Sequence, residues 1–103
     1  MYGTVARITI KPGKLEELKR IGQEMSAVIP GLVSEYVYQT DANPNEFYLV
    51  VIFESEQAYR DNANSPEQHG RYEQLRALLT ADPEWHDGHI IDVFHQDQRA
   101  TAA

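Results

Sequence analysis

Hydrophobic and polar residues follow two periods along this chain, and each switch between them marks an expected element. Residues 2–10 alternate, with Ala6, Ile8 and Ile10 on one face, as in a strand that is covered on one side. Residues 14–29 place apolar side chains at steps of three and four, which predicts an amphipathic helix. Its stripe consists of Leu15, Leu18, Ile21, Met25 and Ile29.

Two further strands are predicted on either side of a turn. Residues 32–40 alternate again, and residues 47–53 are apolar at nearly every position. Between them, Asp41 to Asn45 is rich in turn-forming residues, which predicts a hairpin. A strand that is apolar on both faces is expected to be covered on both faces.

The second half of the chain predicts two helices and a strand. Ser55 is expected to cap a helix over residues 56–62, and Ser65 a second helix that starts with Pro66. The second helix has an apolar stripe of Tyr72, Leu75, Leu78 and Leu79. The last strand is expected at Ile90 to Phe94, after a loop that contains Trp85, His86, Asp87 and His89.

This order, β-α-β-β-α-β with the second helical region in two pieces, predicts the α+β class and a ferredoxin-like split βαβ fold. Such a fold has one four-stranded antiparallel sheet with helices on one face. Residues 1–96 would form the domain and residues 97–103 a disordered tail. Since no segment remains to cover the other face of the sheet, we expect a homodimer through the sheet face.

Composition excludes several classes of function. The 103 residues suffice for one domain, and the net charge of −7 comes without a Lys/Arg cluster, so neither nucleic acid nor membrane binding is expected. The absence of cysteine excludes disulfides, thiolate catalysis and Cys-based metal sites. The first residues lack the pattern of a signal peptide, and no apolar run reaches the ~20 residues of a membrane span, which predicts a cytoplasmic protein.

Several short motifs, taken in their order, resemble the antibiotic-biosynthesis monooxygenase (ABM) family. They are Pro12-Gly13, Pro30-Gly31, the turn Asp41 to Pro44, the strand Phe47 to Phe53, Ser55-Glu56-x-Ala58 and Ser65-Pro66. The resemblance covers Tyr2 to about Phe94. It implies a dimeric α+β barrel with a pocket between the sheet and the helices of each subunit, and oxidation of an aromatic substrate without metal or flavin, so that no cofactor is expected.

The chain departs from its relatives at positions that carry chemistry. Many quinol-oxidising relatives have a His where this chain has Asn62. The haem-degrading branch uses a Trp at that position, a His at the position of Tyr72 and an Asn on the first strand, whereas Thr4 to Arg7 contain no Asn. Haem degradation is therefore not expected.

Cofactor-free oxygenation requires a base, hydrogen bonds to an oxyanion and a dry pocket. His69, one turn into the helix that begins at Pro66, is the candidate base, and Asn62 is the candidate oxyanion donor because an amide can donate but cannot act as a base. The aromatic residues expected to bind the substrate are Tyr36, Tyr38, Phe53, Tyr59 and Tyr72. The structural alternatives are a solvated His69, a polar helix end at Asn62 and ordinary packing of the aromatic residues.

Other polar residues are weaker candidates. His86 and His89 would point to opposite faces of an extended segment, so no metal site is expected there. Arg7 is expected to face the dimer side, near Glu35 if their two strands are close. A cross-strand or inter-subunit ion pair is favoured there over the binding of an anionic substrate.

Three hypotheses follow. The leading one is a homodimeric cofactor-free monooxygenase that oxidises a small planar quinol, phenol or polyketide-like molecule with molecular oxygen. The alternatives are a non-catalytic dimer that binds a small ligand, and isomerase- or dehydratase-type chemistry on the same scaffold. The Asn at position 62 favours binding, and the nearby His69 favours an enzyme. A cavity that touches both residues would favour either over a purely structural dimer.

Overall fold

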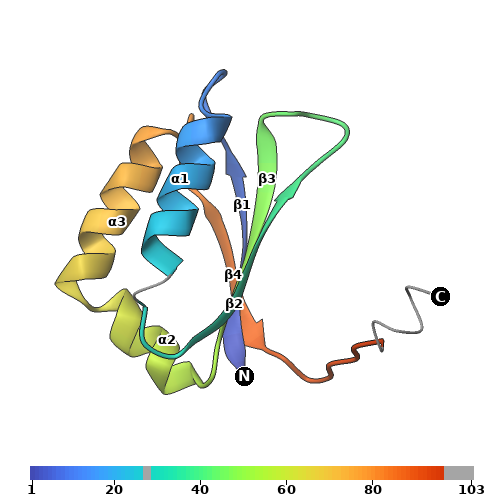
Figure 1. Cartoon of the computed structure of the whole chain (residues 1–103), viewed down its shortest axis with the longest axis vertical. Helices are drawn as coiled ribbons and strands as arrows, with labels where there is room; N and C mark the ends of the chain where they lie inside the picture. Colours follow the sequence, from blue (N-terminus) through green and yellow to red (C-terminus); the bar gives the residue numbers. More distant parts are fainter. Residues whose placement is uncertain (27–28, 97–103) are drawn as a thin grey trace.

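The computed structural model describes residues 1–26 and 29–96, which form one four-stranded antiparallel sheet with all helices on one face (Figure 1). The strand order is β2-β3-β1-β4. The elements are β1 (Tyr2–Thr9), α1 (Leu15–Ser26), β2 (Leu32–Gln39), β3 (Glu46–Phe53), α2 (Glu56–Ala63), α3 (Pro66–Ala77) and β4 (Glu84–His89). This is the ferredoxin-like α+β fold, so the predicted fold class is confirmed. The predicted disordered tail, residues 97–103, lies outside the described residues.

Alternation along β1 decides which face of the sheet carries the core. Ala6, Ile8 and Ile10 are buried against the helices, whereas Val5 and Arg7 on the opposite face are exposed, as predicted. Helix α1, strand β3 and the segment just after α3 supply other core residues, among them Leu18, Ile21, Phe47, Leu49, Leu78 and Leu79. β1 and β3 are the two central strands, and their helix-facing residues Ala6, Ile8, Phe47 and Leu49 belong to the core.

The two predicted helix caps are confirmed. Ser55 Oγ accepts a hydrogen bond from the backbone N–H of Ala58 at 3.1 Å, and Ser65 Oγ accepts one from Gln68 at 3.1 Å. Each cap satisfies a backbone N–H that the first helical turn leaves without a partner. The Asn62 backbone carbonyl accepts hydrogen bonds from both the hydroxyl and the N–H of Ser65, which fixes the short link between α2 and α3.

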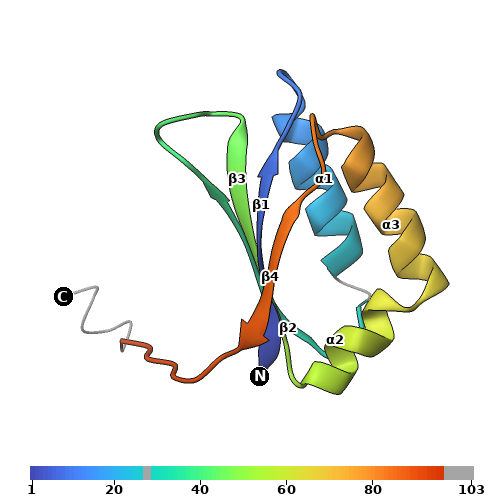
Figure 2. The ribbon, with the colours of Figure 1, turned by 180° about the vertical axis from the view of Figure 1, so that it is seen from behind.

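The last strand lies six residues earlier than predicted. β4 pairs with β1 from Tyr2–His89 to Arg7–Glu84, whereas residues 90–96 leave the sheet and run to the side away from the helices (Figure 2). The Ile90 N–H still donates to the carbonyl of Met1 at 3.0 Å, and residues 91–96 belong to no strand. The prediction was wrong because it followed the apolar run Ile90 to Phe94, in which Ile91 is 96% exposed and Phe94 84% exposed.

Arg7 forms cross-strand ion pairs, but its partners differ from the expected one. Its guanidinium lies 2.8 Å from Glu46 on β3 and 2.6 Å from Glu84 on β4. Glu35 is on β2, which is not adjacent to β1, and it faces the helices. The two strands are therefore not neighbours, so the condition for Arg7 to lie near Glu35 is not met, whereas the favoured cross-strand ion pair is present.

The sheet face opposite the helices has an apolar centre. Tyr36, Val50 and Val5 stand side by side in the strand pairing and form a row across β2, β3 and β1. Tyr36 is 57% exposed and Tyr38 61% exposed. Within the described residues, no helix is both long and apolar enough to cross a membrane.

Candidate functional site

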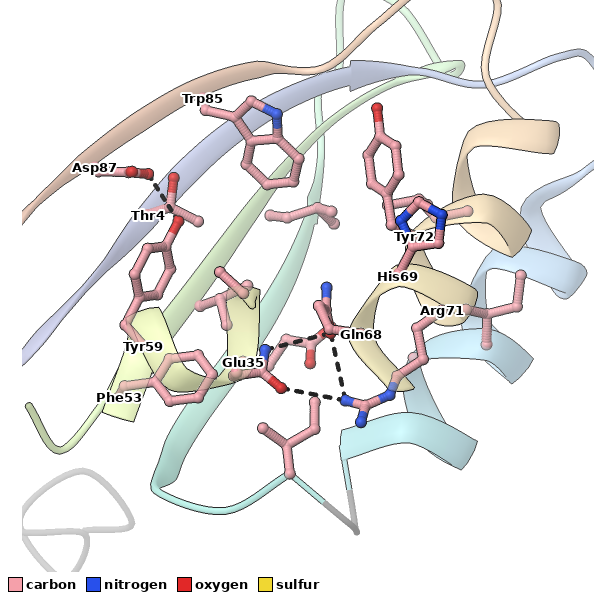
Figure 3. A pocket seen from close by; sticks show the side chains of 18 of the residues that line it. Thr4, Glu35, Phe53, Tyr59, Gln68, His69, Arg71, Tyr72, Trp85 and Asp87 are labelled. Atoms are coloured by element: carbon pink, nitrogen blue, oxygen red, sulfur yellow. Dashed lines mark hydrogen bonds between the residues drawn. The ribbon is translucent and has the colours of Figure 1, made fainter. Parts of the chain in front are cut away.

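A pocket of about 520 Å³, partly open to solvent, lies between the helix-facing side of the sheet and the three helices (Figure 3). Its lining includes five of the seven residues that the sequence singled out: Phe53, Tyr59, Asn62, His69 and Tyr72. The fold thus brings the candidate base and the candidate oxyanion donor to one cavity. Tyr72 and Phe53 form part of its wall and leave its interior open.

Tyr36 and Tyr38 do not line this pocket. The strand register places them beside Val50 and Tyr48, on the exposed face of the sheet. The β2 residues that line the pocket are instead Glu35 and Val37. Contrary to the prediction, Tyr36 and Tyr38 therefore do not share a pocket wall with the other aromatic residues in the single chain.

Two rows of side chains across the sheet form the pocket floor. One row is Glu35, Val51, Thr4 and Asp87, and the other is Val37, Leu49 and Trp85, with the buried Ala6 between the last two. Neighbouring strands lie about 4.8 Å apart, so the carboxylates of Glu35 and Asp87 belong to opposite edges of the sheet, with backbones about 14 Å apart. The floor is therefore apolar in the middle and acidic at each end.

Tyr59 and Asp87 form a hydrogen-bonded pair at one end of the pocket. The Tyr59 hydroxyl donates to Asp87 Oδ1 at 2.8 Å, and its ring meets Phe53 edge-on at 5.6 Å between centroids. Burial, followed by the hydrogen bond and the charge of Asp87, raises the pKa of Tyr59 to about 12. The phenol therefore remains a proton donor at neutral pH.

The hydroxyl of Thr4 lies beside this pair (Figure 3). Thr4 is 5% exposed, and its Oγ1 makes no hydrogen bond of standard geometry within the described part of the chain. Its hydroxyl does interact with that of Tyr59, which slightly offsets the rise in the Tyr59 pKa. Since Thr4 lines the pocket, a bound molecule could supply a hydrogen bond of better geometry.

The raised pKa of Tyr59 leads to a prediction for alkaline solution. One phenol should ionise at about 12, and the stability that its protonated form contributes should be lost as the pH rises from about 10 to about 12. In Asp87→Asn that pKa should fall yet stay above its ordinary value, because burial is the larger cause. Ultraviolet titration of phenolate would measure the pKa in the wild type and in Asp87→Asn, and loss of the titration step in Tyr59→Phe would assign it to Tyr59. An unchanged step in Asp87→Asn would contradict the pairing.

Asn62 belongs to a cluster of amide groups at the other end of the pocket. Its Nδ2 donates to Gln68 Oε1 at 3.3 Å, and its Oδ1 accepts from Arg71 Nη1 at 3.5 Å. Arg71 Nη1 also donates to Gln68 Oε1 at 3.3 Å. An amide nitrogen has two hydrogens, so Asn62 retains a second donor for a ligand.

His69 lies on α3 at the mouth of the pocket, next to Tyr72. Its side chain is 76% exposed, and its Nε2 lies 3.0 Å from Glu73 Oε1, one helical turn further along. With a proton on Nε2, the Nδ1 lone pair is available as an acceptor. His69 can therefore reach the pocket from its rim, while most of its ring is in water.

Glu35 is a further carboxylate of the pocket. Burial alone raises its pKa above the ordinary value. A side chain added at Gly22 of α1 would come within 3.7 Å of Glu35 Oε1, so the helix passes directly over this group. Glu35 is thus a second candidate proton acceptor, in a drier setting than His69.

Sequence reasoning missed several residues that line the pocket: Thr4, Glu35, Gln68, Arg71, Trp85 and Asp87. For β4 a signal was present, because Trp85, Asp87 and His89 alternate with His86 and Gly88 as the residues of a strand do. Arg71 and Gln68 stand three residues apart on α3, which places both on one side of that helix. Within residues 1–26 and 29–96, no group of three or more His, Asp or Glu side chains could hold a metal ion.

Comparison with known structures supports the same fold. The cofactor-independent oxygenase SnoaB from Streptomyces nogalater, solved as the N63A mutant, matches with a TM-score of 0.77 at 18% identity, over 92% of this chain and 97% of that one. Rv0793 from Mycobacterium tuberculosis matches with a TM-score of 0.72 at 20% identity, over 89% and 96%. A conserved protein from Methanosarcina mazei Go1 has a TM-score of 0.72 at 20% identity, over 84% and 89%.

Sequence comparison gives the family directly. No curated protein matches the chain significantly. The family described as "Antibiotic biosynthesis monooxygenase" matches residues 1–74, which include β1 to β3, α2 and most of α3. The chain therefore belongs to the antibiotic biosynthesis monooxygenase family.

Proposed function

We propose that this protein is a cofactor-free monooxygenase that oxidises a small planar phenol or quinol with molecular oxygen. The observation that supports this function best is the shared pocket of Asn62 and His69, with aromatic walls from Phe53, Tyr59 and Tyr72. Aromatic walls with a few polar groups suit a planar substrate. Family membership and the likeness of the fold to a cofactor-independent oxygenase agree with this choice.

The proposed reaction starts with removal of a proton from the substrate. His69 Nδ1 accepts the hydroxyl proton, and the free N–H of Asn62 donates a hydrogen bond to the resulting oxyanion. The electron-rich anion then passes one electron to oxygen, and the two radicals combine into a peroxide at carbon. For an anthrone-like substrate, loss of water turns a CH₂ group into a carbonyl, with one oxygen atom in the product and the other in water.

We further propose that the protein forms a homodimer whose two sheets face each other. The open face has the apolar row of Tyr36, Val50 and Val5 at its centre, and the ion pairs of Arg7 beside it. Ile91 and Phe94 are exposed, and the segment after β4 that contains them runs to this open side of the sheet, away from the helices. A second copy would cover all of these surfaces by an isologous contact.

One observation favours the alternative of ligand binding without turnover. The ring of His69 is 76% exposed, which is a poor setting for a base that must act on a dry substrate. In that case the pocket would hold its ligand without oxidising it.

Oxygen uptake by the purified protein, measured on a panel of quinols and anthrones against autoxidation, tests the proposed function. We expect uptake above the background, and we expect His69→Ala to bring it close to the background. Uptake that survives His69→Ala but is lost in Glu35→Gln would move the base to Glu35. The absence of uptake with every compound, while the same compounds bind, would replace the oxygenase by the ligand-binding function.

A further inference from the structure

The pocket contains an arginine that no carboxylate neutralises. Among residues 1–26 and 29–96, Arg7, Arg20, Arg60 and Arg76 each form an ion pair with Glu or Asp, whereas Arg71 forms none. This is unexpected in a chain with 16 acidic and 9 basic residues, where carboxylate partners are abundant. An unpaired, half-buried guanidinium in a pocket is a site for an anion.

Neutral partners hold Arg71 in place. Only Nη1 is used, and it donates to the amide oxygens of Asn62 and Gln68 at 3.5 and 3.3 Å. A guanidinium has five N–H donors, so a fork of donors remains for two parallel bonds to a carboxylate. In Figure 3 the guanidinium extends from α3 towards these amides and the pocket.

In the described structure, the acidic residues near the pocket do not form an ion pair with Arg71. Glu35 lines the same pocket, but its carboxylate forms no ion pair with Arg71 within 4.0 Å in the part of the chain that the structure describes, and burial raises its pKa. Asp87 is hydrogen-bonded to Tyr59 at the far end of the pocket, and Arg60 is paired with Glu56. Glu54, Asp61 and Glu67 line a neighbouring cleft together with Arg71, but none of these described residues forms an ion pair with it within 4.0 Å.

At the end of the pocket opposite Arg71, a ligand would meet a buried hydroxyl in place of a positive charge. The Thr4 hydroxyl is buried without a well-formed hydrogen bond, beside the Tyr59–Asp87 pair. Hydroxyls both donate and accept, so a ligand hydroxyl would satisfy Thr4 and could also donate to Asp87. The middle of the pocket, between these two ends, is apolar and aromatic.

From this arrangement we infer that the ligand is a planar aromatic hydroxy acid, with its carboxylate on Arg71 and its hydroxyl at Thr4 and Asp87. The inference rests on the proposed function only in taking the ligand to be a planar aromatic compound. The acidic group then determines orientation. The hydroxyl at Thr4 and Asp87 lies at the end of the pocket remote from Arg71, so it is distinct from the hydroxyl that His69 and Asn62 activate in the proposed reaction.

Calorimetric titration under nitrogen tests the inference with three probes: a hydroxynaphthoate whose two groups are at opposite ends, its methyl ester, and the naphthoate without the hydroxyl. The acid is expected to bind at least 10-fold tighter than the ester, with the naphthoate in between. Arg71→Gln should abolish the preference for acid over ester, and Arg71→Lys should retain part of it. Arg20→Gln on the exposed side of α1 removes a paired arginine and should change nothing.

Equal affinity of the wild-type protein for acid and ester would overturn the inference, as would an acid preference that survives Arg71→Gln, or no binding of any probe. The wild-type comparison needs no variant, so a misfolded Arg71 variant does not block the test. Titration under nitrogen measures binding alone, so its result does not depend on the proposed oxygenase activity. Selective binding of the acid under nitrogen, together with no oxygen uptake in air, would support this inference and contradict the proposed oxygenase function.

Discussion

Alanine in place of Gly3 is expected to destabilise the domain by about 3 kcal/mol or more, at the upper end of the cost of overpacking. A Cβ atom on Gly3 would lie 2.0 Å from the carbonyl oxygen of Val51, a contact that real side chains do not make. Because that oxygen belongs to the backbone of a central strand, no side-chain rotation relieves the clash; β1 and β3 must separate. A domain with only 5–15 kcal/mol of total stability should lose roughly 12 °C or more in its melting temperature.

Gly88 is the matched control because it stands opposite Gly3 in the β1–β4 pairing. A Cβ atom at Gly88 would meet nothing within 4 Å, so Gly88→Ala should change stability by about 0.5 kcal/mol or less. Urea unfolding of both variants, followed by circular dichroism, measures the difference. Similar midpoints for the two variants would show that the strands can move apart at little cost, contrary to the close approach in the structure.

The parts of the fold that the sequence predicted are those with a local physical cause. Along β1, alternation of Ala6 and Ile8 with Val5 and Arg7 assigns each face before any neighbour is known. Ser55 and Ser65 cap helices through bonds to residues three positions on, which also require no tertiary contact. Such features are encoded within a few residues.

The wrong predictions concern segments whose structure depends on pairing with a strand that is distant in the sequence. β4 is polar, from Glu84 to His89, and forms because β1 offers hydrogen bonds from Tyr2 to Arg7. The apolar segment Ile90 to Phe94 looks more like a strand, yet β1 has already ended opposite it. Register is a property of two strands, so neither alone predicts it.

The pocket shows the same limit. Both faces of β2 mix polar and apolar residues, with Glu35 and Val37 on one side and Tyr36 and Tyr38 on the other. Hydrophobicity therefore could not say which pair faces the helices, and the aromatic pair was the natural but incorrect choice for the pocket wall. The pocket residues of α2 and α3 were easier to predict, because the short link between these helices brings Asn62 and His69 to the same pocket.

Glutamate in place of Val50 is expected to convert the proposed dimer into a monomer. Val50 stands between Val5 and Tyr36 at the centre of the open face, so a face-to-face dimer would bury two new carboxylates without partners. Removing an unpaired charge from water costs several kcal/mol, and about 3 kcal/mol already weakens an association more than 100-fold. Size-exclusion chromatography with light scattering would report the mass of each variant.

Gln74→Glu provides the control for charge. It adds the same carboxylate to an exposed position of α3, on the helix side of the molecule, and should leave the dimer intact. A dimeric Val50→Glu protein would place the contact on another surface. A wild-type protein that is monomeric at micromolar concentration would remove the proposed dimer altogether.

The monomeric variant should nevertheless retain a working pocket. The pocket lies on the helix side of the sheet and its floor points away from Val50, since neighbouring residues of a strand face opposite sides of the sheet. Val50→Glu should therefore keep the pKa of Tyr59 at about 12 and the affinity for the hydroxynaphthoate within a few-fold of wild type. If both were lost in a folded monomer, the partner subunit would have to complete the site, and the pairing of the sheets would then serve catalysis as well as stability.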